Sequence, residues 1–208
     1  MFNEIDIIDR KGFLVILSAP SGSGKTTVYK KLLQRNEKLD YSISTTTRPI
    51  RETETNGVDY CFVTREQFDK MVSNDEFAEY AEVHGNMYGT SRKVVDTALD
   101  ESRVLLFDID VAGNAQIRER YADFTVSIFI VPPSYDVLKK RLEDRKTDSQ
   151  EVINLRMKNA KQEFARINDY DYIVINDELD KCISDIQEII RSESLRLKRI
   201  NKVNWLKG

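Results

Sequence analysis

Short apolar runs recur along the chain at intervals that suit a sheet. Each run is four to seven residues long and rich in Val, Ile, Leu and Phe. Continuous runs of this kind predict strands that are buried on both faces, as in parallel sheets. The four runs are Phe13–Ser18, Val104–Asp108, Thr125–Val131 and Tyr172–Ile175.

Between and after these runs lie segments with the spacing of amphipathic helices. Strands that alternate with helices predict right-handed crossovers and helices on both faces of the sheet, which is an α/β fold. The predicted helices cover Thr26–Arg35, Val94–Glu101, Tyr135–Arg145, Gln150–Ile167 and a longer stretch beginning at Glu178.

The stretch from residue 40 to 93 breaks this alternation. Short alternating segments are separated there by turn residues such as Asn56-Gly57 and Gly85-Asn86, which is typical of hairpins. We interpret the stretch as a small mixed β insertion. Its expected strands are Tyr41–Thr47, Val58–Val63, Phe77–Val83 and Asn86–Gly89.

The last helix is expected to pack on the core, and Asp177 is placed to cap its start. Its predicted apolar face comprises Leu179, Cys182, Ile183, Ile186, Ile189, Ile190 and Leu197. Basic residues dominate positions 191–208, among them Arg191, Arg196, Lys198, Arg199, Lys202 and Lys207, with Glu193 opposing them. We interpret this tail as a solvated charge excess rather than a binding patch.

Composition narrows the functional classes. A chain of 208 residues suits one compact unit, and its formal charge of -3 does not favour nucleic acid as a partner. Cys61 and Cys182 form no CxxC pair, so neither a disulfide framework nor a zinc site is indicated, and a reducing cytoplasm fits. No apolar run approaches the roughly 20 residues of a membrane helix, so a secreted or membrane-spanning protein is not expected.

The strongest motif is a phosphate-binding loop between the first predicted strand and its helix. Its residues are Ala19, Pro20, Ser21, Gly22, Ser23, Gly24, Lys25 and Thr26, followed by Thr27. Glycines let successive amides turn toward phosphate oxygens, and the helix N-terminus adds partial positive charge. Lys25 is expected to reach the β and γ phosphates of ATP, and Thr26 to ligate Mg²⁺. Ala19 replaces the usual first glycine, and an ordinary Gly/Ser turn is the alternative.

A second set of residues could bind a phosphate monoester. Arg48 and Arg51 follow Ser44 closely, and Tyr60 lies beyond a predicted turn. Arginine offers a permanent charge and a planar fork of donors that matches phosphate. Spacing alone leaves open the alternative of two solvated surface arginines.

Five motifs in this order make the chain resemble the guanylate kinase family from about Phe13 to Ile190. They are Ser-x-Thr-Thr-Arg-x-x-Arg from Ser44, Asn-Gly-x-Asp-Tyr from Asn56, Phe-x-Glu-Tyr from Phe77, Tyr-Gly at Tyr88, and Asp-Ile-Asp at Asp108. The resemblance implies a P-loop three-layer fold with a five-stranded, mostly parallel core sheet at 11–39, 94–134 and 168–200. It also implies an insertion at 40–93 that binds GMP and a helical lid at 135–167.

The same resemblance implies transfer of the ATP γ-phosphate to GMP or dGMP with Mg²⁺. Arg48, Arg51, Tyr60 and Tyr88 would hold the GMP phosphate. The residues that would read the base are Ser44, Glu79 and Thr90, with Thr90 replacing the more usual serine. A carboxylate such as Glu79 can accept hydrogen bonds from N1–H and the 2-amino group of guanine, which adenine cannot donate together.

Two carboxylates end a predicted strand at the edge where open α/β sheets bind ligands. By resemblance, Asp108 lies near the metal, with contact through water left open, and Asp110 helps hold GMP. The alternative is that the pair merely caps the next helix. Asn176 is assigned beside the adenine of ATP on the same resemblance.

The expected lid offers cations that could close over two anionic substrates. Arg141 and Arg145 share a helix face, and Arg156 lies on the next helix. Arginines that contact a transferring phosphoryl group accelerate transfer strongly. The alternatives for the whole chain are a catalytically inactive guanylate-kinase-like interaction module and a kinase with another phosphorylated acceptor. A homodimer stays open.

Overall fold

The computed structural model describes residues 8–36, 38–83, 85–144 and 149–203. Its centre is a five-stranded sheet in the order β10-β9-β2-β8-β3, and every adjacent pair of strands in it is parallel. The α/β fold predicted from the sequence is thereby confirmed. The strands are β2 (Phe13–Ser18), β3 (Leu39–Tyr41), β8 (Val104–Asp108), β9 (Thr125–Val131) and β10 (Tyr172–Ile175).

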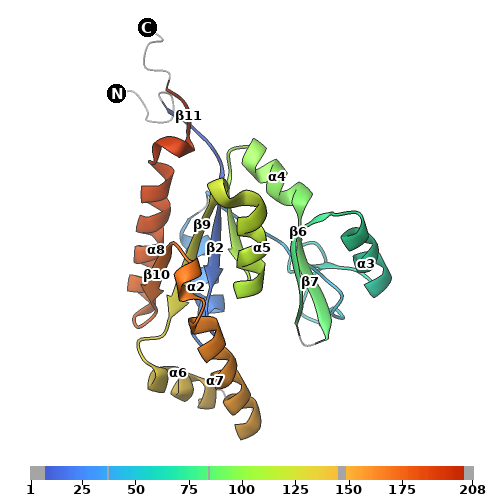
Figure 1. Ribbon diagram of the computed structural model, residues 1–208, viewed down its shortest axis with the longest axis vertical. Helices are drawn as coiled ribbons and strands as arrows, with labels where there is room; N and C mark the ends of the chain where they lie inside the picture. Colours follow the sequence, from blue (N-terminus) through green and yellow to red (C-terminus); the bar gives the residue numbers. More distant parts are fainter. Residues whose placement is uncertain (1–7, 37, 84, 145–148, 204–208) are drawn as a thin grey trace.

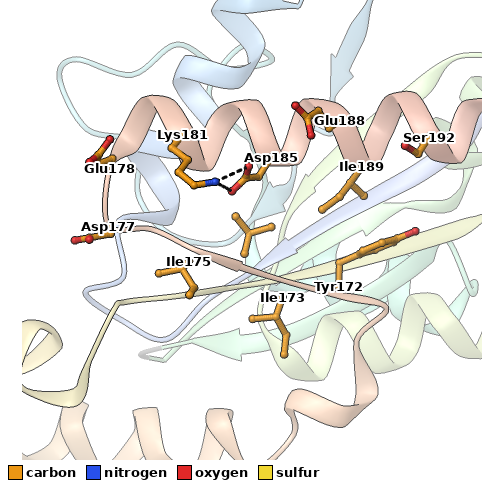
Figure 2. Close-up of a pocket in the computed structure, with 11 residues that line it drawn as sticks. Tyr172, Ile173, Ile175, Asp177, Glu178, Lys181, Asp185, Glu188, Ile189 and Ser192 are labelled. Atoms are coloured by element: carbon orange, nitrogen blue, oxygen red, sulfur yellow. Dashed lines mark hydrogen bonds and ion pairs between the residues drawn. The ribbon is translucent and has the colours of Figure 1, made fainter.

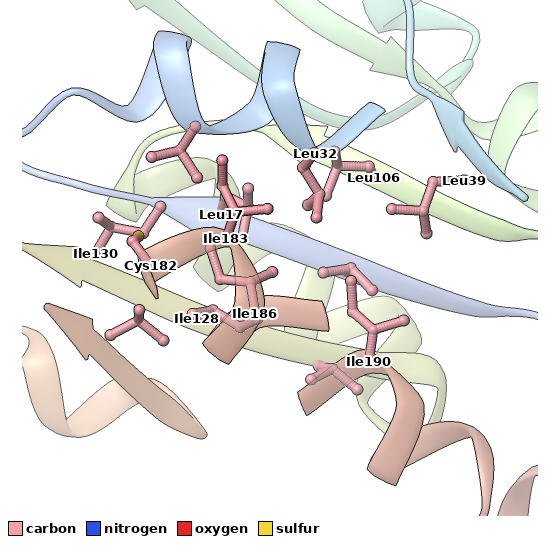
Figure 3. Packing of buried hydrophobic residues seen from close by; sticks show 14 of the residues in the cluster. Leu17, Leu32, Leu39, Leu106, Ile128, Ile130, Cys182, Ile183, Ile186 and Ile190 are labelled. Carbon is pink, nitrogen blue, oxygen red and sulfur yellow. The ribbon is translucent and has the colours of Figure 1, made fainter. Parts of the chain in front are cut away.

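Helices cover both faces of this sheet, as Figure 1 shows. On one face, α2 (Lys25–Arg35) and α8 (Leu179–Ser194) pack on the side chains of Phe13, Val15 and Leu17 from β2. Figure 3 shows this cluster from close by. On the other face, α4 (Arg92–Asp100) and α5 (Val111–Tyr121) pack on Leu14 and Ile16. The apolar residues of β2 are therefore part of two hydrophobic cores, because successive side chains of a strand point to opposite faces of the sheet.

The insertion forms a second, four-stranded sheet in the order β5-β4-β7-β6. Its strands are β4 (Thr45–Thr46), β5 (Cys61–Phe62), β6 (Phe77–Val83) and β7 (Asn86–Ser91), and β6 and β7 form the expected antiparallel hairpin. Helix α3 (Arg65–Ser73) begins with a capping box at Thr64 and Gln67, and its Phe68 packs on Phe77 and Met87.

The predicted start of the insertion at residue 40 is too early. Asp40 and Tyr41 pair with Leu105 and Leu106 of β8, so they complete the core sheet. The run Tyr41–Thr47 suggests one alternating strand because apolar and polar residues alternate from Tyr41 to Ser44. In the fold it is divided between two sheets, β3 and β4.

Two helices project from the carboxyl end of the sheet (Figure 1). Helices α6 (Tyr135–Glu143) and α7 (Gln150–Phe164) bury Leu138, Leu142, Ile153, Met157 and Ala160 between them. This small core is separate from the two cores of the main sheet. The pair is thus a unit of the kind that the predicted lid requires.

The C-terminal prediction was partly wrong. Helix α8 starts after Glu178 without a side-chain cap from Asp177, and Leu197 lies beyond the helix with 88% of its surface exposed. The chain then forms β11 (Ile200–Val203), which pairs antiparallel with β1 (Ile8–Arg10). Short 3-10 turns occupy Ala122–Phe124, Ile167–Asp169 and Leu197–Arg199.

Arg199, assigned from the sequence to a solvated tail, is instead buried with 1% of its surface exposed. Its guanidinium lies 4.9 Å from the centre of the Phe13 ring and donates to the backbone oxygen of Asp123 at 2.8 Å. The carboxylate of Glu193 is buried nearby and accepts from Tyr172 at 2.7 Å. These contacts anchor the C-terminal segment; Lys207 lies outside the described residues. Among the described helices, none has the length and apolar character needed to cross a membrane.

Candidate functional site

The predicted phosphate loop joins β2 to α2 as expected. Gly22 and Gly24 have φ of +92° and +87°, a backbone conformation that side-chain-bearing residues rarely adopt. A Cβ on Gly24 would lie 2.6 Å from the amide nitrogen of Asn176. Helix α2 begins at Lys25 with no side-chain cap, so its first amides are available to an anion at the loop.

Lys25 occupies the junction between the phosphate loop and the neighbouring strand end. Its ammonium lies 2.7 Å from a carboxylate oxygen of Asp108 and donates to the backbone oxygen of Ile109 at 3.1 Å. Ser18 also donates to Ile109 at 2.9 Å, which ties the end of β2 to the end of β8. Parallel strands bring these residues together because their carboxyl ends share one edge of the sheet.

A cavity of about 310 Å³ opens beside Lys25, between the core and the insertion. Predicted residues from both parts line it together, although more than eighty positions separate the first from the last. They are Lys25, Ser44, Tyr60, Glu79, Tyr88, Asp108 and Asp110. The cavity therefore joins the end of the phosphate loop to the residues predicted to bind GMP.

Glu79 is the most unusual group in this cavity. The side chain is buried, with 5% of the residue exposed, and accepts a hydrogen bond from the Thr90 hydroxyl at 2.7 Å. Burial raises the pKa of the Glu79 carboxyl to about 7, although the bond from Thr90 opposes the shift. A buried acceptor of this kind can take donors from a bound base.

The Thr90 substitution for serine leaves that contact intact. Thr90 is fully buried in β7 and lies opposite Glu79 in the β6–β7 ladder, so its hydroxyl reaches the carboxylate across the strands. Thr90 of β7 therefore holds the carboxylate of Glu79 on the neighbouring strand β6.

Arg48 is not a solvated arginine. Its guanidinium forms an ion pair with Glu54 at 2.7 Å and lies 5.4 Å from the centre of the Tyr60 ring. The hydrogen bond to Glu54 raises the pKa of Arg48, so its charge is permanent. Tyr88 packs edge-on against Tyr60 with the ring centres 5.9 Å apart. Arg51 is exposed, and its backbone amide donates to Glu54 at 2.9 Å, so Glu54 organises both arginine positions.

Two interpretations were offered for Asp108 and Asp110, a role in the substrate site and a role in capping the next helix, and the two residues differ in this respect. Asp108 pairs with Lys25, as a residue of the transfer site would. Asp110 caps α5 by accepting from the backbone amide of Gly113 at 2.8 Å, which is the helix-capping alternative, while it also lines the cavity.

Two of the predicted lid arginines reach the phosphate-loop side. Arg141 donates to the backbone oxygen of Asn176 at 3.0 Å, and Arg156 contacts the Ser21 hydroxyl at 3.2 Å. Asn176 is buried and donates to the backbone oxygen of Ser23 at 2.7 Å. Arg145 lies outside the described residues. A second cavity of about 340 Å³ lies here, lined by Gly22, Gly24, Thr27, Arg141, Asn176, Asp177 and Leu179.

Three residues beside these cavities were not identified from the sequence. Glu163 of α7 is half-buried near Ser21 and Lys25, and its pKa is raised by burial. It lies two turns beyond Arg156 on the same helix face, a spacing that could have identified it. Tyr41 lines the cavity beside Lys25, and a Cβ on Gly113 would lie 3.0 Å from a carboxylate oxygen of Glu79. Neither Tyr41 nor Gly113 belongs to a motif that would have identified it from the sequence.

The side chains near the phosphate loop can be compared with what a magnesium site requires. In the described part of the chain, no group of three or more His, Cys, Asp or Glu side chains could hold a metal. Magnesium in kinases needs no such cage because it is held by one or two protein oxygens, water and substrate phosphates. Thr26, exposed at the first turn of α2, and Asp108 beside Lys25 supply oxygens of the right kind.

A pocket with a larger volume than either of these cavities lies elsewhere. A space of about 670 Å³ lies between β10 and α8, with Ile173, Ile175 and Ile189 among its lining residues (Figure 2). None of the predicted site residues lines it. The size of a pocket therefore does not locate the chemistry in this fold.

Known proteins match this chain over most of its length. Residues 11–193 match the family model described as guanylate kinase. Proteins named guanylate kinase from Carboxydothermus hydrogenoformans and Bradyrhizobium diazoefficiens are 43% and 45% identical to this chain. The first alignment covers 95% of this chain and 97% of the relative, and the second covers 98% and 93%.

A solved structure gives the same result. The crystal structure of guanylate kinase from Anaplasma phagocytophilum superposes with a TM-score of 0.76 at 34% sequence identity. The match covers 93% of this chain and 92% of that one.

Proposed function

The chain belongs to the guanylate kinase family and is therefore an ATP:GMP phosphotransferase; from this premise we propose how its own residues bind the substrates and promote transfer. GMP occupies the cavity between core and insertion, and ATP lies along the phosphate loop under α6 and α7. The observation that carries this assignment is Glu79, a buried carboxylate in the same cavity as Lys25.

The base end of the acceptor site is formed by Glu79, Thr90 and Ser44. Glu79 in its charged form accepts from N1–H and the 2-amino group of guanine, while Thr90 holds the carboxylate in place. A base without those two donors would leave a buried carboxylate unpaired, which is costly. The site would therefore select guanine and reject adenine.

The phosphate end is formed by Arg48, Arg51, Tyr60 and Tyr88. Glu54 and the Tyr60 ring hold Arg48 in a fixed direction, so little side-chain freedom is lost when the phosphate of GMP binds. Hydroxyls of Tyr60 and Tyr88 add donors to the same group. The base end and the phosphate end of the site thus bind the same nucleotide. Because dGMP has the same base and phosphate as GMP, it is an acceptor too.

On the donor side, the amides after Gly22 and Gly24 bind the ATP phosphates and Lys25 moves from Asp108 to the β and γ phosphates. Residues that line the second cavity, Asn176 among them, hold the adenosine part of ATP. Thr26, and Asp108 directly or through water, would hold Mg²⁺, which when bound neutralises phosphate charge. A phosphate oxygen of GMP attacks the γ-phosphorus as ADP leaves, so no covalent intermediate with the protein is needed.

Repulsion between two anionic substrates is the main obstacle to transfer. Arg141 and Arg156 already lie on the phosphate-loop side of α6 and α7, where they can neutralise charge on the transferring group. Arg145, four positions after Arg141 in the sequence, is assigned the same role. Closure of α6 and α7 over ATP would also exclude water and limit hydrolysis.

The inactive interaction module is the alternative to this proposal. Lys25, Thr26 and Arg48 all stand in place, and no comparison favours the alternative. We assign the activity to synthesis and recycling of guanine nucleotides; the expected cytoplasmic location and the oligomeric state stay predictions.

The base assignment is tested by ADP release with GMP, dGMP, AMP, CMP and UMP as acceptors. We expect GMP and dGMP to exceed the others in kcat/KM by about 10⁴. A value for AMP or UMP equal to that for GMP would refute base recognition by Glu79.

The phosphate-loop assignment is tested by Lys25→Ala. Turnover should fall by about 10³ or more, with the circular dichroism spectrum unchanged. Lys30→Ala, an exposed lysine on the same helix, is the matched control and should retain turnover. Near-normal turnover of Lys25→Ala would remove Lys25 from the mechanism.

A further inference from the structure

Tyr41 is a cavity residue to which the proposed mechanism gives no role. It is the last residue of β3 and lines the acceptor cavity together with Lys25, Tyr60 and Asp108. Its neighbour β8 runs parallel to it and ends at Asp108, so Tyr41 lies on the same edge of the sheet as that carboxylate. The position is on the core side of the cavity, opposite the insertion.

The ring of Tyr41 is fixed by a second tyrosine. Tyr29 of α2 stacks on it with ring centres 5.2 Å apart and planes within 3° of parallel. Tyr29 lies one helical turn after Lys25, so the two share a face of α2. The stack therefore forms a rigid wall that runs from the phosphate-loop lysine to the acceptor cavity.

The chemistry of this wall suits an anion. Burial, the Tyr29 hydroxyl and the nearby Asp108 carboxylate all raise the pKa of Tyr41, so its hydroxyl stays protonated at neutral pH. A protonated phenol can donate a hydrogen bond without adding charge. Such a donor offsets the repulsion that Asp108 would exert on a phosphate group in the same cavity.

Resting on the proposed function, we propose that the Tyr41 hydroxyl donates a hydrogen bond to the phosphate of GMP from the core side, facing Arg48, Tyr60 and Tyr88 across the cavity. The acceptor phosphate is then held between the insertion and the core. Tyr41 is a binding residue for the monophosphate and has no contact with the base.

Tyr41→Phe tests the proposal because it removes the hydroxyl and keeps the stacked ring. KM for GMP should rise about tenfold, as expected for loss of one hydrogen bond to a charged group, while KM for ATP and the thermal midpoint stay unchanged. Guanosine, which lacks the phosphate, is the diagnostic probe: its inhibition constant should be the same for both proteins. Tyr80→Phe, on the exposed side of the insertion, is the control and should leave all constants unchanged.

Two results would overturn the proposal. An unchanged KM for GMP in Tyr41→Phe would show that the hydroxyl does not bind the phosphate. A parallel rise in the inhibition constant of guanosine would assign the hydroxyl to the nucleoside instead. Failure of the unsubstituted chain to phosphorylate GMP would refute the proposed function itself. That result is distinct from failure of the Tyr41 proposal because it is obtained with the unsubstituted chain.

Discussion

Replacing Glu79 with glutamine should make the protein more stable at alkaline pH and less able to bind GMP. The folded chain raises the pKa of this carboxyl from 4.5 to about 7, chiefly because the group is buried. The folded state therefore holds a proton that the unfolded state has lost between these two values. Stability contributed by that proton is complete below about pH 4.5 and is lost as pH rises through about 7.

The size of the effect follows from the same difference in pKa. Each pKa unit corresponds to about 1.4 kcal/mol, so the charged carboxylate costs the folded state about 3 kcal/mol above pH 7. Glutamine has nearly the same shape, can still accept from Thr90, and carries no charge. Glu79→Gln should therefore be more stable than the original chain by up to about 3 kcal/mol at pH 8, and about equal at pH 4.5.

Urea unfolding of both proteins at the two pH values measures this difference directly. Glu82→Gln, on the same strand but exposed, is the matched control and should show no pH-dependent gain. KM for GMP should rise roughly 10- to 100-fold in Glu79→Gln because a charged acceptor is lost. If the gain in stability were the same at both pH values, burial of a charged Glu79 would be the wrong explanation.

Three further predictions concern the two substrates separately. Acidification from about pH 8 to about pH 6 should raise KM for GMP because Glu79 becomes protonated, and Glu79→Gln should flatten this component of the profile; a profile identical in both proteins would contradict the assignment. Gly113→Ala should raise KM for GMP several-fold and leave KM for ATP unchanged, since the new Cβ would crowd Glu79 at 3.0 Å; unchanged GMP kinetics would show that the carboxylate can move aside. Asn176→Ala should raise KM for ATP about tenfold because the bond to the Ser23 backbone is lost, and equal increases for both substrates would argue against a donor-side role.

The core of the fold was predictable because its strands are buried on both faces. Phe13–Ser18, Val104–Asp108, Thr125–Val131 and Tyr172–Ile175 are continuous apolar runs in the sequence and strands with the same bounds in the structure. Strand β3 was missed since Leu39–Tyr41 has three residues and a central aspartate, and only its pairing with β8 makes it a strand. Short edge strands depend on tertiary pairing more than on their own composition.

Helix α5 was missed for a different reason. Its residues show almost no amphipathic pattern, since Gly113 and Asn114 are buried along with Ile117. Burial of Arg199 was equally hidden, because a basic residue in a basic tail gives no sign of a partner such as the Phe13 ring. Side chains held by contacts far away in the sequence leave no local pattern.

The phosphate loop carries its own motif, so its residues could be assigned one by one. The acceptor residues could be assigned only by resemblance, and their arrangement came from the fold. Glu54, which orients Arg48, has no motif and belongs to a loop that looks like ordinary polar sequence. Residues that position others are harder to predict than residues that contact a ligand.

Helix α5 has a consequence for how errors in substrate choice would be expressed. At its start Asp110 accepts from Gly113, in its first turn Gly113 lies under Glu79, and one turn later Gln116 bonds both backbone groups of Tyr80. Strand β6, which carries Glu79, is thus attached to the same helix that follows Asp108, the partner of Lys25. If Glu79 reads the base as proposed, a base that displaces it would strain the helix that follows Asp108, the carboxylate paired with Lys25. We therefore expect fidelity to be visible in turnover as well as in binding.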